Sequence, residues 1–264
     1  MTDRIPVLDR GDRGEVHVLA DDETLARAAA DLFAEHTMAA VAQRGWAVVA
    51  LSGGSTPRRM GELLAQPPFQ EQVPWQHLHF FWGDERWVPL DSPDSNAGTA
   101  KRTFLDQVPV PPEQIHAFPT VGLSPRQAAA AYAREIQDLI GEDDGSLPRF
   151  DLVLLGMGDD GHTASLFPGT AALDERTLLA AANPVPKLDA TRLTLTAPVI
   201  NAGRAVVFLV GGEGKADTLA AVLDGPERPN ELPAQLIRPV DGPLRWLVDR
   251  AAASRLAGFE SIDG

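Results

Sequence analysis

Cysteine is absent from this chain of 264 residues. Its absence excludes a disulfide framework, a thiolate metal site and a cysteine nucleophile. Long apolar runs are missing as well, because no stretch approaches the roughly 18 residues that a membrane-spanning helix needs. The first residues lack the basic-then-apolar pattern of a signal peptide. We therefore expect a cytoplasmic protein that makes no contact with a membrane.

Positive charge is also scarce: 23 Lys and Arg residues stand against 37 Asp and Glu residues, and the formal net charge is −14. A nucleic acid partner needs a basic face, so this composition disfavours one. The acidic residues are spread along the chain, which indicates a role in solubility. An anionic substrate would have to be bound by a few local cations.

The chain does have apolar runs that alternate with segments of helical spacing, and 44% of its residues are hydrophobic. Strands are predicted at residues 16–19, 46–51, 78–82, 150–155, 192–196, 205–210 and 244–248. Helices are predicted from Asp21 to Gly45, from Pro57 to Pro67, from Ser124 to Gly141 and from Ala216 to Leu223, with a short one after the last strand.

This alternation predicts an α/β fold, Rossmann-like, with a largely parallel sheet and helices on both faces. We expect one domain over residues 1–264, because no repeat or low-complexity linker divides the chain. Two segments are expected to be surface loops: Glu142 to Pro148, which is polar, and Asp174 to Thr191, which contains several prolines.

Four predicted strands are followed by residues suited to chemistry, and the first such exit is 51–57, Leu-Ser-Gly-Gly-Ser-Thr-Pro. Gly53 and Gly54 let the backbone expose N–H groups, Ser55 and Thr56 add hydroxyls, and the N-terminus of the next helix attracts anions. These residues predict a phosphate cradle. It lacks the Gly-Lys-Ser/Thr ending of a P-loop and the dinucleotide fingerprint. A helix start that Ser55 or Thr56 merely caps is the alternative.

The second exit is 83–89, Gly-Asp-Glu-Arg-Trp-Val-Pro. Arg86 is suited to bind a phosphate through two hydrogen bonds. Asp84 is suited to accept hydrogen bonds from sugar hydroxyls or to move a proton, and Asn96 follows shortly after. For Glu85 we expect a solvated position with a local Glu–Arg pair.

The third exit is 156–167, Gly-Met-Gly-Asp-Asp-Gly-His-Thr-Ala-Ser-Leu-Phe. His162 is the best general-base candidate of the chain, because an unperturbed imidazole titrates near neutrality. Asp160 is placed to orient this histidine or to fix a turn together with Gly161. Asp159 is expected to be a solvated turn residue.

The fourth exit, 211–215, is again rich in glycine and ends in Lys215, in a chain with few lysines. It predicts a contact with phosphate, and a lysine that points to solvent is the alternative. Arg192, at the start of its predicted strand, is a further phosphate candidate. Thr194 and Thr196 share its face, which we expect to line the same cleft.

In an open parallel sheet such exits meet at one edge, where ligands bind. The acidic residues and histidines lack the spacing of a metal site, so neither a metal nor another cofactor is implied. A G-x-S-x-G elbow is also missing, which disfavours a serine hydrolase. The combination favours attack by His-activated water on a small phosphorylated ester.

These motifs resemble the 6-phosphogluconolactonase family. The matching segments are 51–57, 83–89 with Ser95-Asn96, and 156–169, and their order and spacing fit from about Ala20 to Leu256. The resemblance implies hydrolysis of 6-phosphogluconolactone to 6-phosphogluconate, the second step of the oxidative pentose phosphate pathway. It also implies a Rossmann-like sheet shared with glucosamine-6-phosphate deaminases and ribose-5-phosphate isomerases.

Carried over to this chain, the resemblance makes His162 the base for water and places Asp84 and Arg86 in the substrate site. Phosphate or nearby hydroxyls would be bound by the Gly53–Thr56 loop, Arg192 and Lys215. The expected partner is thus a phosphorylated sugar lactone, and a monomer or a homodimer would serve it.

Two other functions remain open from the sequence. The deaminase and isomerase branch is similar through Asp-Gly-His, but it carries a glutamate five residues after the histidine, where this chain has Phe167. An apolar ring cannot orient or ionise a histidine, so ring-opening chemistry is disfavoured. A non-catalytic sugar-phosphate sensor on the same fold would bind without turnover, and the presence of both Asp84 and His162 argues against it.

Overall fold

A seven-stranded sheet forms the centre of the structure, a computed structural model that describes residues 5–141 and 144–259. Six neighbouring strands are parallel, and β1 joins β2 antiparallel at one edge. In sheet order the strands are β1 (Val7–Asp9), β2 (Glu15–Leu19), β10 (Leu244–Asp249), β9 (Val206–Val210), β6 (Leu152–Leu155), β3 (Ala47–Leu51) and β4 (Leu78–Trp82). The predicted parallel sheet is confirmed.

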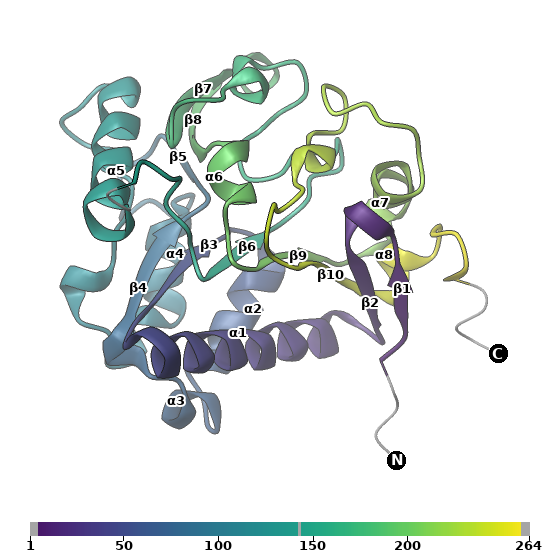
Figure 1. Cartoon of the computed structure of the whole chain (residues 1–264), viewed down its shortest axis with the longest axis horizontal. Coiled ribbons are helices and arrows are strands. Elements are labelled where there is room, and N and C mark those ends of the chain that lie inside the picture. Colours follow the sequence, from purple (N-terminus) through teal and green to yellow (C-terminus); the bar gives the residue numbers. More distant parts are fainter. Residues whose placement is uncertain (1–4, 142–143, 260–264) are drawn as a thin grey trace.

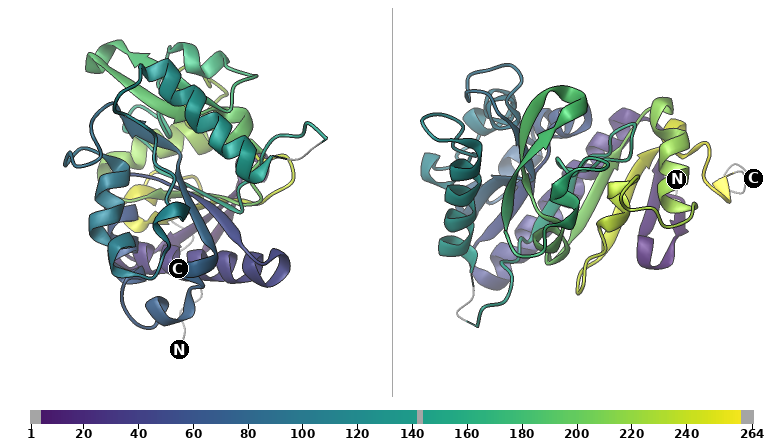
Figure 2. Two further views of the ribbon diagram at one scale, coloured as in Figure 1. Left: turned by 90° about the vertical axis from the view of Figure 1, so that its left-hand side faces the viewer. Right: turned by 90° about the horizontal axis from the view of Figure 1, so that it is seen from above.

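Helices flank this sheet (Figure 1). They are α1 (Asp22–Arg44), α2 (Ser55–Leu64), α3 (Phe69–Gln72), α4 (Asn96–Thr103), α5 (Pro125–Ile140), α6 (Ala197–Asn201), α7 (Ala216–Leu223) and α8 (Arg250–Ala253). The long helix α1 runs along one side of the sheet, and α5 lies on the other side (Figures 1 and 2). Of these helices, α3, α4 and α6 were not predicted, and α2 starts two residues before the predicted Pro57.

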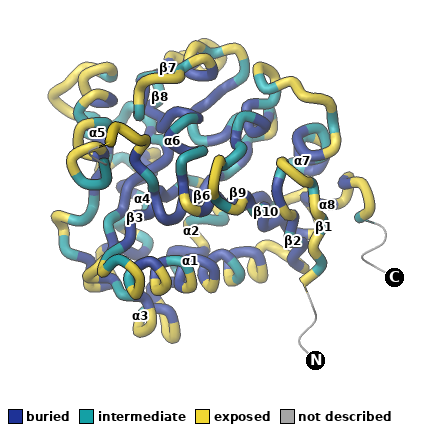
Figure 3. Tube along the Cα trace, viewed as in Figure 1, coloured by how far each residue is buried: buried dark blue, intermediate teal, exposed yellow. Residues whose placement is uncertain are grey.

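Local sequence explains the principal elements. Every residue of β3, β6 and β9 is buried, as expected of apolar runs in a parallel sheet (Figure 3). Helix α1 begins with a capping box, in which Asp21 accepts from the Thr24 backbone N–H, and it ends at Gly45 with φ 84°. Helix α5 begins in the same way, with Ser124 as its N-cap and Pro125 in the first turn.

A second, three-stranded antiparallel sheet stands above the central one (Figures 1 and 2). Of this sheet, only the strand at residues 192–196 was predicted. It consists of β5 (Asp84–Arg86), β8 (Ala190–Leu195) and β7 (Ala180–Val185). The segment Asp174–Thr191 is therefore not an extended surface loop, because most of it forms β7 and the turn into β8. Pro184 lies in β7 at the edge of this sheet, where a strand tolerates proline.

Both outer strands of the seven-stranded sheet have limited free edges. β1 is only three residues long. On the other side, Ile115 forms a bridge with Phe80 of β4, and the backbone N–H of His116 donates to the Phe80 carbonyl at 2.8 Å.

Two expectations concern the chain as a whole. Within the described residues, no helix combines the length and apolar character needed to cross a membrane. That the chain is one domain over residues 1–264 stays a prediction. Of the expected loop Glu142–Pro148, residues 142 and 143 lie outside the described residues, residues 144–147 are exposed, and Pro148 is buried.

Candidate active site

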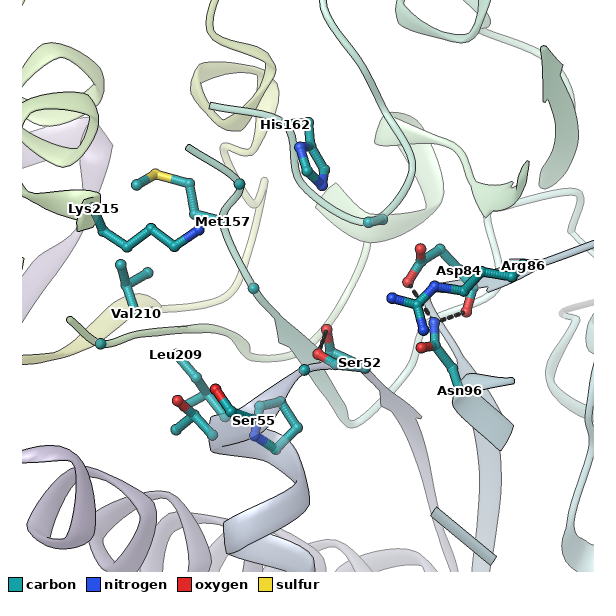
Figure 4. A pocket seen from close by; sticks show the side chains of 18 residues that line it. Ser52, Ser55, Asp84, Arg86, Asn96, Met157, His162, Leu209, Val210 and Lys215 are labelled. Atoms are coloured by element: carbon teal, nitrogen blue, oxygen red, sulfur yellow. Dashed lines mark hydrogen bonds between the residues drawn. The ribbon is translucent and has the colours of Figure 1, made fainter. Parts of the chain in front are cut away.

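The four polar exits follow β9, β6, β3 and β4, which are neighbours in the sheet. The chain leaves β3 toward β4 on one side and later fills the other side with β6 and β9, so the exits meet at a topological switch point. A cavity of about 330 Å³ opens there, lined by residues of all four exits (Figure 4). The sheet order thus brings together Ser52 and Lys215, which are 163 positions apart in sequence.

The Gly53–Thr56 loop forms one wall of this cavity. Gly54 is the N-cap of α2 with φ 114°, and no side chain caps the helix, so Ser55 and Thr56 are not the predicted alternative caps. Their hydroxyls and the open N-terminus of α2 therefore face the cavity. Gly53 is required by close approach, since a Cβ there would lie 1.9 Å from Asn96 Oδ1.

Asp84 is held from two sides at the opposite wall. Asn96 Nδ2 donates to Asp84 Oδ1 at 3.2 Å (Figure 4). From the other side, Ser165 Oγ donates to Asp84 Oδ2 at 2.7 Å. The same Asn96 amide also donates to the Asp84 carbonyl at 2.9 Å. These bonds fix the carboxylate in one orientation toward the cavity.

The prediction that Glu85 is solvated is wrong, because only 2% of this residue is exposed. Its carboxylate accepts from the backbone N–H groups of Arg86, Asn96 and Ala97 and from Ser95 Oγ, at 2.7–3.0 Å. Burial raises the pKa of Glu85, and these backbone donors oppose the rise. Glu85 therefore ties β5 to the N-terminus of α4 rather than pairing with Arg86.

Two arginines face each other across β5 and β8, where Arg86 is paired in register with Arg192. Arg86 Nη1 donates to the Asp94 carbonyl at 2.8 Å, whereas the side chain of Arg192 makes no hydrogen bond or ion pair with the described residues. Burial lowers the pKa of Arg192, and repulsion from Arg86 lowers it further. Two adjacent cations with so little compensation are suited to an anionic group.

These arginines line a second cavity of about 340 Å³ that shares Asp84, Arg86, His162 and Ala164 with the first. We call the cavity beside Ser55 and Lys215 the loop lobe, and the cavity beside Arg192 the arginine lobe. We expected Arg192, Thr194 and Thr196 to line the same cleft, but only Arg192 does so. Thr194 is fully buried and accepts from the Ser165 N–H, and Thr196 donates to the Leu178 carbonyl.

His162 lies where the two lobes meet. Its Nδ1 is 2.5 Å from Asp160 Oδ1, and its ring stacks on Phe167 with centroids 4.1 Å apart. Burial lowers the pKa of His162 to about 4, an effect that the nearby Asp84 carboxylate opposes. The imidazole is therefore neutral near pH 7, and Asp160, which only accepts, makes Nδ1 the donor.

The glycines of this loop allow that arrangement. A Cβ on Gly158 would lie 2.0 Å from His162 Nδ1, and Gly161 has φ 75° with Leu232 packed against it. The predicted pairing of Asp160 with His162 is present in the structure.

Lys215 lies in the loop lobe (Figure 4). Its ammonium forms an ion pair with Asp159, so it does not point freely to solvent. The side chain of Asp159 is 80% exposed, in agreement with a solvated turn residue, and the Lys215 ammonium lowers its pKa. The loop lobe therefore has a cation opposite the N-terminus of α2.

Sequence reasoning missed two side chains of this site. Ser165 lies inside the third motif, but its contact with Asp84 links positions 81 residues apart. Lys187 lies in the proline-containing segment, and its ammonium pairs with Asp160. Within residues 5–141 and 144–259, no group of three or more His, Cys, Asp or Glu side chains is placed to hold a metal ion.

The fold and the cleft define a Rossmann-like α/β enzyme with an Asp–His pair at the switch point of its sheet. The family described as glucosamine-6-phosphate isomerases/6-phosphogluconolactonase matches residues 20–246. The chain belongs to this family.

Individual relatives agree with this assignment. A 6-phosphogluconolactonase of Synechocystis sp. is 42% identical over 92% of this chain and 98% of its own length. The solved 6-phosphogluconolactonase from Trypanosoma brucei has a TM-score of 0.81 and 30% identity, over 92% of this chain and 98% of that one. The solved structure of a monomeric glucosamine-6-phosphate deaminase shares the fold, with a TM-score of 0.76 and 22% identity. The match covers 91% of this chain and 99% of the deaminase chain.

Proposed function

We propose that the chain hydrolyses 6-phospho-D-glucono-1,5-lactone to 6-phospho-D-gluconate, with His162 as the base that activates water. The observation that carries this proposal is a neutral imidazole, oriented by Asp160, at the junction of two cationic lobes. The reaction is that of the 6-phosphogluconolactonases to which the chain is similar. It is the second step of the oxidative pentose phosphate pathway.

The chemistry follows from the tautomer of His162. Because Nδ1–H donates to Asp160, Nε2 keeps its lone pair and takes a proton from water. The water oxygen bonds to C1 of the lactone, and the carbonyl oxygen becomes an oxyanion. When this intermediate collapses, the C1–O5 bond breaks and the imidazolium returns its proton to O5. The carboxylic acid that results ionises in water.

The substrate is oriented by the two lobes. We place its phosphate in the loop lobe, between the Ser55–Thr56 turn and Lys215, where a helix N-terminus and an ammonium group converge. The arginine lobe, with Arg192 beside Arg86, then faces the lactone carbonyl and stabilises the oxyanion. Asp84, held by Asn96 and Ser165, accepts from a sugar hydroxyl.

Ring-opening deaminase or isomerase chemistry has less support. The position that carries a glutamate in that branch is Phe167, which is 5% exposed and stacks on His162. An aromatic ring supplies no carboxylate to move a proton, whereas lactone hydrolysis needs none there.

The test is lactone hydrolysis by three proteins: wild type, His162→Ala and His77→Ala. The lactone is generated in situ with glucose-6-phosphate dehydrogenase, and 6-phosphogluconate is followed against the spontaneous rate. Loss of the base should lower kcat by about 10²–10⁴. The control removes an exposed histidine that lies outside both cavities.

A near-normal rate in His162→Ala would reject the base. No acceleration by the wild type would reject the lactonase, and binding and turnover of glucosamine 6-phosphate would then separate a deaminase from a sensor.

A further inference from the structure

The turn between β7 and β8 places Lys187 beside the pair formed by Asp160 and His162. This turn is a short 3-10 helix, η6 (Pro186–Leu188), and Asp189 closes it with φ 46°. Its position at the end of the second sheet places Lys187 in the arginine lobe beside Asp160 and His162. Half of the Lys187 side chain is exposed, so it is not required to fill the core.

Lys187 contacts two residues that themselves contact His162, namely Asp160 and Phe167. Its ammonium forms an ion pair with Asp160 Oδ2, while Asp160 Oδ1 contacts His162 Nδ1 at 2.5 Å. The ammonium also lies 5.0 Å from the centroid of Phe167, whose ring stacks on His162. Asp160 Oδ1 also accepts a hydrogen bond from the backbone N–H of His162 at 3.2 Å. One carboxylate is thus held between a lysine and the base.

The charges around His162 show what this contact does. The groups that face it are Asp84, Arg86, Asp159, Asp160, Lys187, Arg192 and Lys215. An unpaired carboxylate against Nδ1 would stabilise the imidazolium and so remove the base. A lysine on the far oxygen offsets that charge and still leaves the near oxygen to accept from Nδ1. The carboxylate then fixes the tautomer without protonating the ring.

We propose that Lys187 is a positioning residue that acts through Asp160 to hold His162 oriented and neutral. The proposal rests on the proposed function only in taking His162 as the base. It predicts a change in the titration of His162 when Lys187 is removed. A lysine that only bound a substrate anion would change KM and leave that titration alone.

The experiment follows the imidazole of His162 by NMR in the free enzyme. Its resonance is assigned by its absence from His162→Ala, and wild type, Lys187→Met, Lys187→Arg and Lys101→Met are titrated. In Lys187→Met we expect the pKa of His162 to rise by about one unit, because the Asp160 charge is no longer offset. Lys187→Arg should restore the wild-type titration. Lys101→Met, which breaks a surface pair with Asp106, is the matched control.

The pH profile of kcat/KM is the second readout. Its acid limb should move up with the NMR titration in Lys187→Met, with the spontaneous rate subtracted and the fold checked by circular dichroism at each pH. An unchanged titration in a folded Lys187→Met would overturn the proposal, whatever its turnover. A shifted titration in an enzyme that does not hydrolyse the lactone would support the coupling and reject the lactonase instead.

Discussion

Lys215 and Arg192 are cations in different lobes of one cleft, and His162 lies where the lobes meet. Lys215 is compensated by Asp159, whereas Arg192 faces another arginine. The two residues therefore have different tasks in the proposed mechanism. In that mechanism Lys215 binds the phosphate, which is present throughout the reaction, and Arg192 stabilises the charge that develops at the carbonyl oxygen.

This difference is measurable with two substrates, 6-phosphogluconolactone and unphosphorylated glucono-1,5-lactone. Lys215→Met should raise KM for the phosphorylated lactone by about 10- to 150-fold, since a hydrogen bond to a charged group contributes about 1.5–3 kcal/mol. It should barely affect the unphosphorylated lactone. Arg192→Ala should lower kcat for both.

Lys101→Met serves as the control for both substrates. Equal effects of Lys215→Met on the two lactones would place the phosphate elsewhere. An effect of Arg192→Ala on the phosphorylated lactone alone would move the phosphate to the arginine lobe.

Residues that lie within a local motif were predictable from the sequence. His162, Asp160 and the Gly53–Thr56 loop are recognised by glycine and helix-start patterns, and the structure brings them to one cleft. Lys187 was not predictable, because its partner Asp160 is 27 positions away and the pairing exists only once β7 and β8 have formed. Their roles in turnover stay predictions until the variants are measured.

Among the elements, β5 and α4 depend on one buried carboxylate. Glu85 accepts four hydrogen bonds, three of them from the backbone at the junction of β5 and the start of α4. Asn96, the first residue of α4, holds Asp84 together with Ser165. Glu85 therefore positions a wall of the cleft without lining either cavity.

Replacing Glu85 with Gln should lower the free energy of unfolding by about 1–3 kcal/mol, because an amide cannot accept from all four donors. It should also lower kcat/KM, since Asn96 would no longer be fixed against Asp84. Urea unfolding and lactone hydrolysis measure the two effects. Glu113→Gln, at an exposed glutamate, is the control. Wild-type stability and activity in Glu85→Gln would show that the four hydrogen bonds to Glu85 are dispensable.

The element that sequence reasoning missed most clearly is the second sheet. β5 is three residues long and fully charged, so it carries no apolar alternation that would predict a strand. β7 contains Pro184, which favours a loop in isolation, and its edge position tolerates this proline. By contrast, the buried strands of the central sheet were predicted within two residues, because a parallel strand covered on both faces is apolar throughout.

At the scale of the whole molecule, burial lowers the pKa of three histidines, His36, His79 and His162. For His79 the neighbouring His116 adds to the effect, and for His36 Arg245 does. A histidine whose pKa is lower in the folded state binds a proton more readily when unfolded. Stability is therefore complete above the unfolded pKa of about 6.5 and falls as the pH drops below it.

We expect the urea midpoint to fall between pH 7 and pH 5.5. His162 alone should contribute a loss of about 1 kcal/mol over this interval, so His162→Gln should flatten the dependence. His77→Gln, at an exposed histidine, should leave it unchanged. Glu85 and Asp151, whose pKa values burial raises, act in the opposite direction at lower pH. A midpoint that stays constant to pH 5.5 would contradict the prediction.

The borders of the seven-stranded sheet bear on how this protein behaves when crowded. An open sheet invites another chain to add a strand wherever a long row of backbone groups is unpaired. Here the backbone of Phe80 in β4 is already engaged by Ile115 and His116, and β1 offers only three residues. Strand addition is thereby discouraged at both borders, and with a net charge of −14 molecules also repel one another. The protein is thus built against fibre formation at high protein concentration.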